Sequence, residues 1–140
     1  MNHFSAISIE RLSTCHKDLQ ILFSHVLLYY DCSVLCGQRG EKDQNEAYEN
    51  GYSKLKYPNS KHNSEPSMAI DVLPYEKNHI DSGKTQSAFF AGYVKAVADH
   101  LFEVGAMKHH IRLGIDWDND LDIDDTTFWD AAHYEIIPRT

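Results

Sequence analysis

The sequence predicts an α+β fold in which a small antiparallel sheet is flanked by helices. Two segments, residues 8–30 and 85–107, repeat their apolar residues at helical spacing. Four shorter apolar runs are typical of strands: residues 33–35, 68–73, 111–115 and 133–137. Helices and strands do not alternate in a regular order, which favours α+β over a parallel α/β sheet. With 140 residues, the chain is predicted to form a single domain over residues 1–140.

The N-terminal half begins with the helical segment 8–30, for which Ser8 is the expected N-cap. Its apolar residues recur at mixed three- and four-residue spacing, so the segment forms one or two helices that end near Asp31. That stripe consists of Leu12, Leu19, Ile21, Leu22, Val26 and Leu27. A short strand and a turn then lead to a helix over 41–50. Gly51 ends this helix because glycine adopts the left-handed conformation without strain.

The C-terminal half begins with a polar loop over 52–67, followed by an apolar strand over 68–73. Residues 74–84 are predicted to form a loop, and 85–107 a helix with one buried face. That face consists of Phe89, Tyr93, Val97, Leu101 and Val104. A strand over 111–115, an acidic loop over 116–125 and a last strand over 133–137 complete the chain.

Composition limits the classes of function. The chain carries 13 Lys and Arg against 21 Asp and Glu, a net charge of −8, whereas a phosphate-binding surface needs clustered cations. Nucleic acid is therefore not the expected partner. No apolar run approaches the roughly 20 residues that span a bilayer, and the N-terminus has no basic stretch before an apolar core. We expect no membrane span and synthesis in a cytoplasm without a signal peptide. The three cysteines are predicted to be buried thiols.

Asp71 is the unusual residue of the predicted strand 68–73, because it places a carboxylate in an apolar run. Such a group is costly unless it pairs with a cation. His62 and His133 could join Asp71 around one metal ion, and two histidines, an aspartate and a water make up a catalytic zinc site. Alternatively, Asp71 forms a buried salt bridge with Arg39, and the histidines are packing residues.

Four groups of motifs follow one another along the chain. The first contains Gly37-Gln38-Arg39 with Gln44 and Gly51, and the second Ser60-Lys61-His62-Asn63 with Pro66-Ser67-Met68-Ala69-Ile70-Asp71-Val72. The third contains Arg112-Leu113-Gly114 with Asp116-Trp117-Asp118, and the fourth is Asp130-Ala131-Ala132-His133-Tyr134-Glu135. Together these motifs resemble those of the M15 peptidases, which include VanY-like D,D-carboxypeptidases and phage L-alanyl-D-glutamate endopeptidases.

The resemblance implies a Hedgehog/D,D-peptidase-like fold and a zinc ion held by His62, Asp71 and His133. It also implies that Asp130 is the general base, which takes a proton from water and gives it to the leaving amine; otherwise Asp130 would cap a turn. Arg39 would hold a substrate carboxylate or the developing oxyanion, or else form a structural salt bridge. Glu135 shares a strand face with His133 and would be either its partner or a solvated carboxylate.

The function implied by the resemblance is a zinc-dependent peptidase that cleaves the stem peptide of peptidoglycan. Without a signal peptide, we expect a phage or prophage L-alanyl-D-glutamate endopeptidase, an endolysin, that is made in the cytoplasm and reaches the bacterial periplasm through a separate pore protein. It is expected to be a monomer. Two alternatives stay open: a D,D-carboxypeptidase, and a catalytically silent, zinc-containing binding domain of the same fold.

The acidic loop over 116–125 raises a further metal hypothesis. Its aspartates alternate as they do at the start of an EF-hand loop, but Leu121 and Thr127 replace the glycine and the glutamate that this motif requires. The loop is therefore predicted to be either a looser Ca²⁺ site or a solvated acidic loop.

Overall fold

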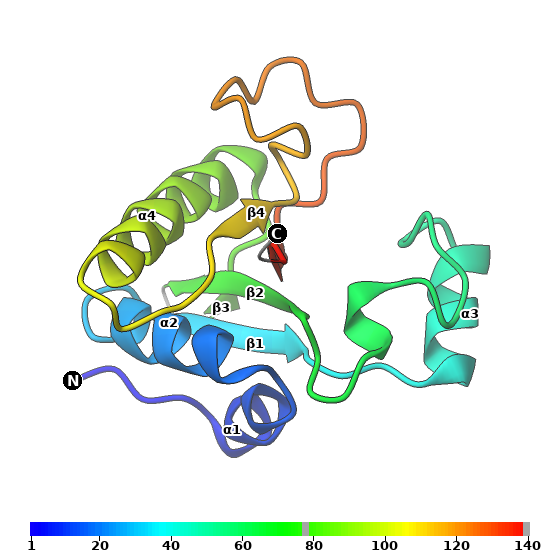
Figure 1. Ribbon diagram of the computed structural model, residues 1–140, viewed down its shortest axis with the longest axis horizontal. Coiled ribbons are helices and arrows are strands. Elements are labelled where there is room, and N and C mark those ends of the chain that lie inside the picture. Colours follow the sequence, from blue (N-terminus) through cyan, green and yellow to red (C-terminus); the bar gives the residue numbers. More distant parts are fainter. Residues whose placement is uncertain (77–78, 139–140) are drawn as a thin grey trace.

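The chain folds around one antiparallel sheet, as the α+β prediction requires. The computed structural model describes residues 1–76 and 79–138. In chain order, its elements are α1 (Ala6–Ser13), α2 (Lys17–Leu27), β1 (Cys32–Cys36), α3 (Glu41–Glu49), a short 3₁₀ helix (Lys61–Asn63), β2 (Ala69–Glu76), β3 (His79–Ile80), α4 (Lys84–Glu103), β4 (Ile111–Leu113) and β5 (His133–Ile136). Figure 1 shows the N-terminal and C-terminal parts of the chain meeting at the sheet.

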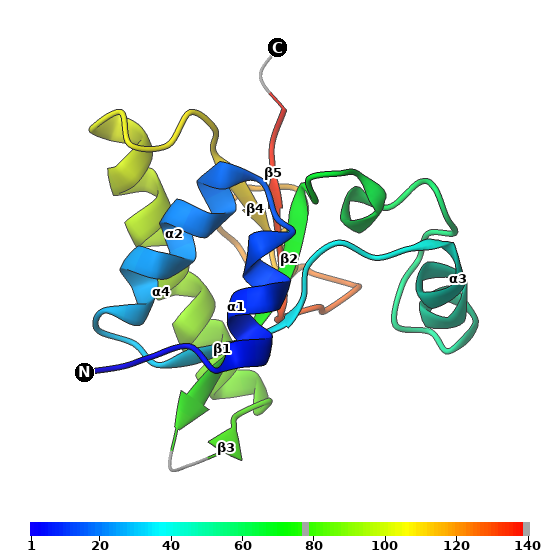
Figure 2. The same ribbon diagram turned by 90° about the horizontal axis from the view of Figure 1, so that it is seen from below.

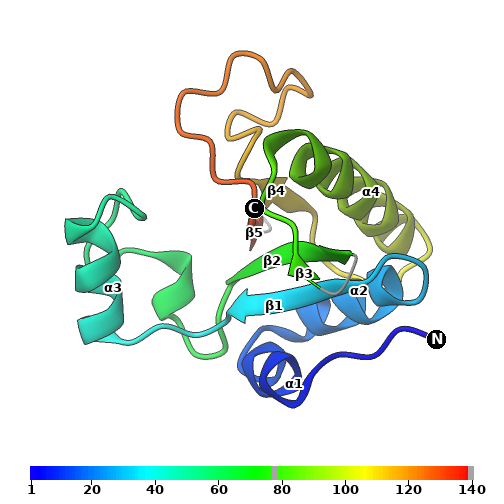
Figure 3. The ribbon, with the colours of Figure 1, turned by 180° about the vertical axis from the view of Figure 1, so that it is seen from behind.

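The sheet has the strand order β1-β2-β5-β4, and β3 pairs with the end of β2. Every pair is antiparallel. Figure 2 shows the sheet nearly edge-on, with α2 and α4 on one side and α3 on the other. Seen from behind in Figure 3, α3 stands away from the sheet beyond the end of β1. The two sides of the sheet are therefore unequal, since only one of them is covered by long helices.

The hydrophobic core lies between the sheet and the helices α2 and α4. Tyr134 of β5 is fully buried at its centre, with its ring against those of Phe23 and Phe90 at 5.3 and 6.5 Å between centroids. Further core residues come from both helices and the strands: Leu19, Leu22, Val26, Val34, Ile70, Val72, Ala91, Val94, Ala98, Leu101, Ile111 and Ile136. Among the described residues, no helix is long and apolar enough to cross a membrane.

The predicted helical segment 8–30 forms two helices, and its expected N-cap is wrong. Ser5 caps α1, since its hydroxyl accepts a hydrogen bond from the Ser8 N–H at 3.2 Å. Ser8 is instead buried within α1, and its hydroxyl accepts the Val34 N–H at 3.0 Å. A serine that could cap a helix thus joins α1 to β1, which sequence alone does not reveal.

The loop predicted over 74–84 is also partly wrong. Strand β2 continues through Pro74 to Glu76, where it pairs with β3. Proline lacks an N–H, so it cannot donate to a ladder. The next residue, Tyr75, donates its N–H to the Asp31 carbonyl at 2.9 Å, and this bond keeps the strand in place. Residues 77 and 78 of the predicted loop lie outside the described part of the chain.

The helix α4 buries only part of the predicted face: Leu101 is buried and Tyr93 and Val97 pack against the core as expected, but the ends of the predicted stripe are exposed. Phe89 and Val104 are 66% and 62% exposed, whereas Phe90 is 1% exposed. The buried residues of α4 are Ser87, Phe90, Ala91, Val94, Ala98 and Leu101. Three of these are small, so the helix can approach the sheet closely on this side. The predicted stripe favoured the larger side chains, and that choice is the reason for the error.

The two adjacent phenylalanines of α4 test this packing. Replacing a fully buried phenylalanine by alanine removes apolar burial and leaves a cavity, at a cost of about 3–5 kcal/mol. We expect Phe90→Ala to lower the free energy of unfolding by that amount in urea denaturation. The matched control Phe89→Ala should lower it by less than about 1 kcal/mol. A larger loss for the Phe89 variant would contradict the observed face.

Candidate active site

The structure brings His62, Asp71 and His133 together on the open side of the sheet. Asp71 of β2 and His133 of β5 are directly opposite each other in the antiparallel pair. Residues opposite each other in such a pair have their side chains on the same face. Ile70 and Val72 point into the core, so Asp71 points to the other face by strand alternation.

His62 reaches the same face from the 3₁₀ helix rather than from the sheet. Ser60 and Asn63 form a capping box around this short helix. The Arg39 N–H donates to the His62 carbonyl at 2.7 Å, and the Met68 N–H donates to the Lys61 carbonyl at 3.0 Å. These bonds fix the position of His62, although it lies in a segment with little regular structure.

The three side chains have the spacing of metal ligands. The Oδ1 atom of Asp71 lies 3.2 Å from His62 Nε2 and 3.4 Å from His133 Nδ1. Ligand atoms about 2.0–2.2 Å from a tetrahedral zinc ion lie roughly 3.3–3.5 Å from one another. A nitrogen from each ring and a carboxylate oxygen therefore fit around one cation of this size.

The hydrogen bonds of the two histidine rings orient one nitrogen of each ring toward Asp71. His62 Nδ1 lies 2.8 Å from the Gly37 carbonyl, and His133 Nε2 lies 2.9 Å from Glu135 Oε1. Both of these oxygens accept hydrogen bonds, so each ring keeps a proton on the nitrogen that faces them, and a metal cation would replace only the proton on the nitrogen that faces Asp71. The other nitrogen of each ring faces Asp71. Fixing the tautomer through a second hydrogen bond is usual for metal-binding histidines.

Asp71 also forms the alternative salt bridge that the sequence left open. Its Oδ2 atom lies 3.3 Å from Arg39 Nη2, while Oδ1 faces the two histidines. Burial raises the pKa of Asp71, but hydrogen bonds from His133 and His62 more than offset this and hold that pKa well below its usual range. Burial lowers the pKa of His62, but the hydrogen bonds to Asp71 and Cys36 and the charges of these two groups together outweigh it and raise that pKa to about 10. The site thus favours positive charge beside Asp71.

Glu135 is a buried partner of His133 rather than a solvated carboxylate. Its side chain is 8% exposed, and its Oε2 atom lies 2.8 Å from Lys61 Nζ. Burial raises the pKa of Glu135, but hydrogen bonds from His133 and Lys61 lower it to about 2. Glu135 therefore stays charged and orients His133. Nothing in the sequence indicated that Lys61 would be its counter-ion.

Asp130 lies in the turn before β5 and faces the same cleft. Burial and the nearby Asp71 carboxylate raise the pKa of Asp130 to about 6. The turn is held by Gly114, whose carbonyl accepts the Asp130 N–H and whose N–H donates to the His133 carbonyl, both at 2.8 Å. A Cβ atom on Gly114 would lie 2.0 Å from the Asp130 carbonyl oxygen. The strand predicted over 111–115 accordingly ends at Leu113.

These side chains lie in a cleft of about 760 Å³. One wall is the loop after α3, and the other is the segment between β4 and β5. The lining residues are Arg39, Tyr52, Ser53, Lys54, Leu55, Asn59, Ser60, Lys61, His62, Asp71, Trp117, Thr127, Phe128, Asp130, His133 and Glu135. The wall residues Lys54 and Phe128 were not singled out from the sequence, because loops show no periodicity that indicates which side chains face a site.

The acidic loop does gather Asp116, Asp118 and Asp120 within metal-ligating distance of one another. Asp116 is buried, and its two carboxylate oxygens accept the N–H groups of Asp120 and Leu121 at 3.2 and 2.9 Å. These bonds organise the loop through the protein itself. The Ca²⁺ site proposed for residues 116–125 stays a prediction.

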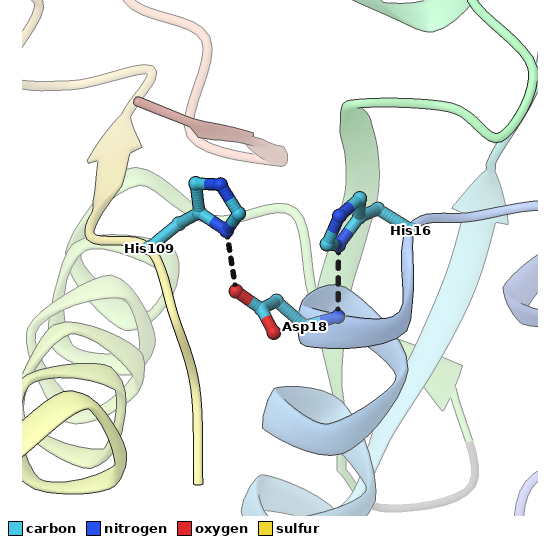
Figure 4. Close-up of side chains that lie close together, drawn as sticks. All are labelled: His16, Asp18 and His109. Carbon is cyan, nitrogen blue, oxygen red and sulfur yellow. Dashed lines mark hydrogen bonds and ion pairs between the residues drawn. The ribbon is translucent and has the colours of Figure 1, made fainter. Parts of the chain in front are cut away.

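A second His–Asp–His group lies apart from the cleft and was missed by sequence reasoning. Figure 4 shows His16 and His109 on either side of Asp18 at the start of α2. Asp18 Oδ2 lies 2.8 Å from His109 Nδ1 and accepts the Lys108 N–H at 3.0 Å. The Asp18 N–H donates to His16 Nδ1 at 3.0 Å. These are hydrogen-bond distances, so the group joins α2 to the segment before β4.

The cleft defines a class of protein before any relative is considered. Two imidazoles and a carboxylate that converge on one point, beside a further carboxyl group of raised pKa, are the groups required for metal-assisted hydrolysis. The chain belongs to the phage L-alanyl-D-glutamate peptidase family, whose model matches residues 1–137. It is a peptidoglycan peptidase, and the family resemblance of its motifs is confirmed.

A solved structure confirms the predicted fold. The crystal structure of the Serratia marcescens L-Ala D-Glu endopeptidase ChiX matches with a TM-score of 0.74 and 22% sequence identity. The match covers 98% of this chain and 90% of that chain. Both proteins therefore share a small antiparallel sheet with flanking helices. No curated protein sequence matches this chain.

The two His–Asp–His groups give a prediction with an internal control. We expect the purified protein to bind one divalent metal ion per chain after dialysis, as measured by atomic emission. His62→Ala or His133→Ala should reduce this content and lower the melting temperature, because a metal that binds only the folded state stabilises it. His109→Ala should leave the metal content unchanged. Full metal content in the His133 variant would contradict the assignment.

Proposed function

We propose that this peptidase is a zinc-dependent endopeptidase that cleaves the L-alanyl–D-glutamate bond of the peptidoglycan stem peptide. The observation that carries the proposal is the convergence of His62 Nε2, His133 Nδ1 and Asp71 Oδ1 in the cleft of a chain from this family. Two nitrogens and one carboxylate oxygen are a common ligand set of catalytic zinc, with a further position left for water. The names of the family and of ChiX both specify the L-alanyl–D-glutamate bond, and this supports the choice of that bond here.

Each charged residue of the cleft has a separate part in the proposal. Zinc, when bound by His62, Asp71 and His133, would polarise the scissile carbonyl and lower the pKa of a water to about 7. Asp130 would take a proton from a water in the cleft and would then give it to the leaving amine. Arg39, whose guanidinium lines the cleft beside Asp71, stabilises the developing negative charge on the carbonyl oxygen.

The pKa of Asp130 suits the role of general base. A base is most effective when its pKa is close to the working pH. Asp130, at about 6, is ionised at neutral pH but still able to hold a proton, whereas Glu135, at about 2, is not. Among the described residues no side chain or N–H group donates a hydrogen bond to the Asp130 carboxylate, so it is available to a water in the cleft.

An endolysin role is the biological form of this proposal. Such an enzyme would be made in the cytoplasm as a monomer and would act in the bacterial periplasm after release by a separate pore protein. The family name supports a phage or prophage origin. The D,D-carboxypeptidase and the silent, zinc-containing binding domain are the alternatives to be tested against it.

A digest of purified peptidoglycan separates these functions. An L-alanyl–D-glutamate endopeptidase should release peptides that begin with D-glutamate and leave L-alanine on the glycan. Mass spectrometry of the products detects both fragments. Loss of a terminal D-alanine alone would instead indicate a carboxypeptidase, and no product from a metal-loaded protein would indicate a silent domain.

The exchange Asp130→Asn tests the general base. It keeps the shape of the side chain but removes its ability to accept a proton. We expect the metal content and the melting temperature to stay near those of the wild type, while the digestion rate falls roughly 10²- to 10⁴-fold. Wild-type activity should decline as the pH falls through about 6, because Asp130 then becomes protonated, and a bound cation would lower this midpoint.

Two features keep this test specific. The acid-side decline should disappear in the residual activity of the Asp130→Asn variant, since no carboxyl group remains there to titrate. Asp124→Asn, in the exposed part of the same segment, is the matched control and should digest peptidoglycan at the wild-type rate. An Asp130→Asn protein that is equally fast would contradict the assignment.

A further inference from the structure

Three Lys and Arg side chains line the cleft, and they differ in their partners. Arg39 lies 3.3 Å from the Asp71 carboxylate, and Lys61 lies 2.8 Å from that of Glu135. Lys54 has no carboxylate within ion-pair distance among residues 1–76 and 79–138. Its Nζ atom instead lies over the Phe128 ring, 5.2 Å from the centroid. Lys54 is therefore the cation of the cleft whose charge is not matched by the protein.

The ring beneath Lys54 belongs to a row of aromatic rings that leads to the metal-binding group. The Trp117 Nε1–H donates to the Phe128 carbonyl at 2.7 Å, and the two rings are stacked with centroids 6.2 Å apart. The Trp117 ring also lies near the His133 ring, with 5.2 Å between their centroids. Lys54, from the loop after α3, thus reaches across to the opposite wall of the cleft. Through Phe128 and Trp117, Lys54 is connected by side-chain contacts to His133 in the same cleft.

We propose that Lys54 binds the free α-carboxylate of the D-glutamate residue on the leaving side of the scissile bond. This inference rests on the proposed function. In an L-alanyl–D-glutamate bond the leaving nitrogen is attached to the carbon that carries this carboxylate, and the stem peptide continues through the γ-carboxyl group. A negative charge therefore enters the cleft within a few atoms of the reacting carbonyl.

Lys54 can meet this charge at a lower cost than the other two cations. Arg39 and Lys61 already form ion pairs with largely buried carboxylates, so a substrate carboxylate would have to compete with Asp71 or Glu135 for them. Lys54 is exposed, and a cation over a phenylalanine ring at an exposed site is only weakly held. Its ammonium group can turn toward a carboxylate while its methylene chain stays on Phe128.

The protein's net charge makes such a local cation more important. At −8, the chain as a whole does not attract an anionic substrate. A carboxylate in the cleft also meets Asp130 and Glu135. The unpaired positive charge of Lys54 offsets this repulsion for a substrate that carries the α-carboxylate. When that group is an amide, the substrate has no charge there, and Lys54 gives no such advantage.

The test compares two substrates and two lysine variants. The substrates are muropeptides with D-glutamate or with D-isoglutamine after L-alanine, which differ only in this charge. Lys54→Met keeps the length of the side chain and its contact with Phe128. We expect kcat/KM for the D-glutamate substrate to fall roughly threefold to fivefold, mainly through KM, as for the loss of one partly shielded ion pair. The D-isoglutamine substrate should change by less than about twofold.

Lys56→Met is the matched control, because it removes the same charge from the same loop. Lys56 lies over the Tyr48 ring at 5.0 Å and does not line the cleft. The Lys56→Met variant should leave kcat/KM unchanged for both substrates. Equal losses for both substrates in the Lys54 variant, or no loss for the D-glutamate substrate, would overturn the role of Lys54 and leave the proposed function intact. A wild-type protein that cuts neither substrate at this bond would overturn the proposed function, and this inference with it.

Discussion

The negative charge of Asp71 is the constraint on which the rest of the site depends. A carboxylate on a central strand, with 17% of its side chain exposed, costs free energy unless positive charge meets it. Here Oδ1 faces two imidazoles and Oδ2 faces a guanidinium. These partners come from the turn after β1, the 3₁₀ helix and the start of β5. One carboxylate thus joins three segments that are distant in sequence, and the same charge favours a metal cation between the rings.

Side chains alternate between the two faces of each strand, and this alternation determines both the core and the site. In β5, Tyr134 and Ile136 belong to the core, while His133 and Glu135 face the cleft. In β2, Ile70 and Val72 belong to the core on either side of Asp71. A shift of one residue in this pairing would move every side chain to the other face. The apolar residues therefore hold the register that brings Asp71 opposite His133, so the packing of the core positions the chemistry.

Local patterns explain which parts of this protein could be predicted from its sequence. A carboxylate in an apolar run is unfavourable without a cationic partner, so Asp71 indicated that His62, His133 or Arg39 lies beside it. The face of α4 was predicted only in part, because small residues that allow close packing carry little hydrophobic signal. The pair Lys61–Glu135 and the wall formed by Lys54 and Phe128 depend on loops, whose contacts follow from the whole fold.

Three carboxylates share one cleft, yet their surroundings give them different acidities and therefore different roles. Two imidazoles and Arg39 hold Asp71 in its charged form, and Lys61 with His133 does the same for Glu135. Asp130 receives no such hydrogen bond among the described residues, and burial beside Asp71 raises its pKa to about 6. Environments that separate the pKa values of neighbouring carboxyl groups also separate their functions. The negative charge of Asp71 thus has two effects: it attracts a cation to the two histidines, and it raises the pKa of Asp130. The proposed metal ligand Asp71 and the proposed base Asp130 are therefore coupled electrostatically.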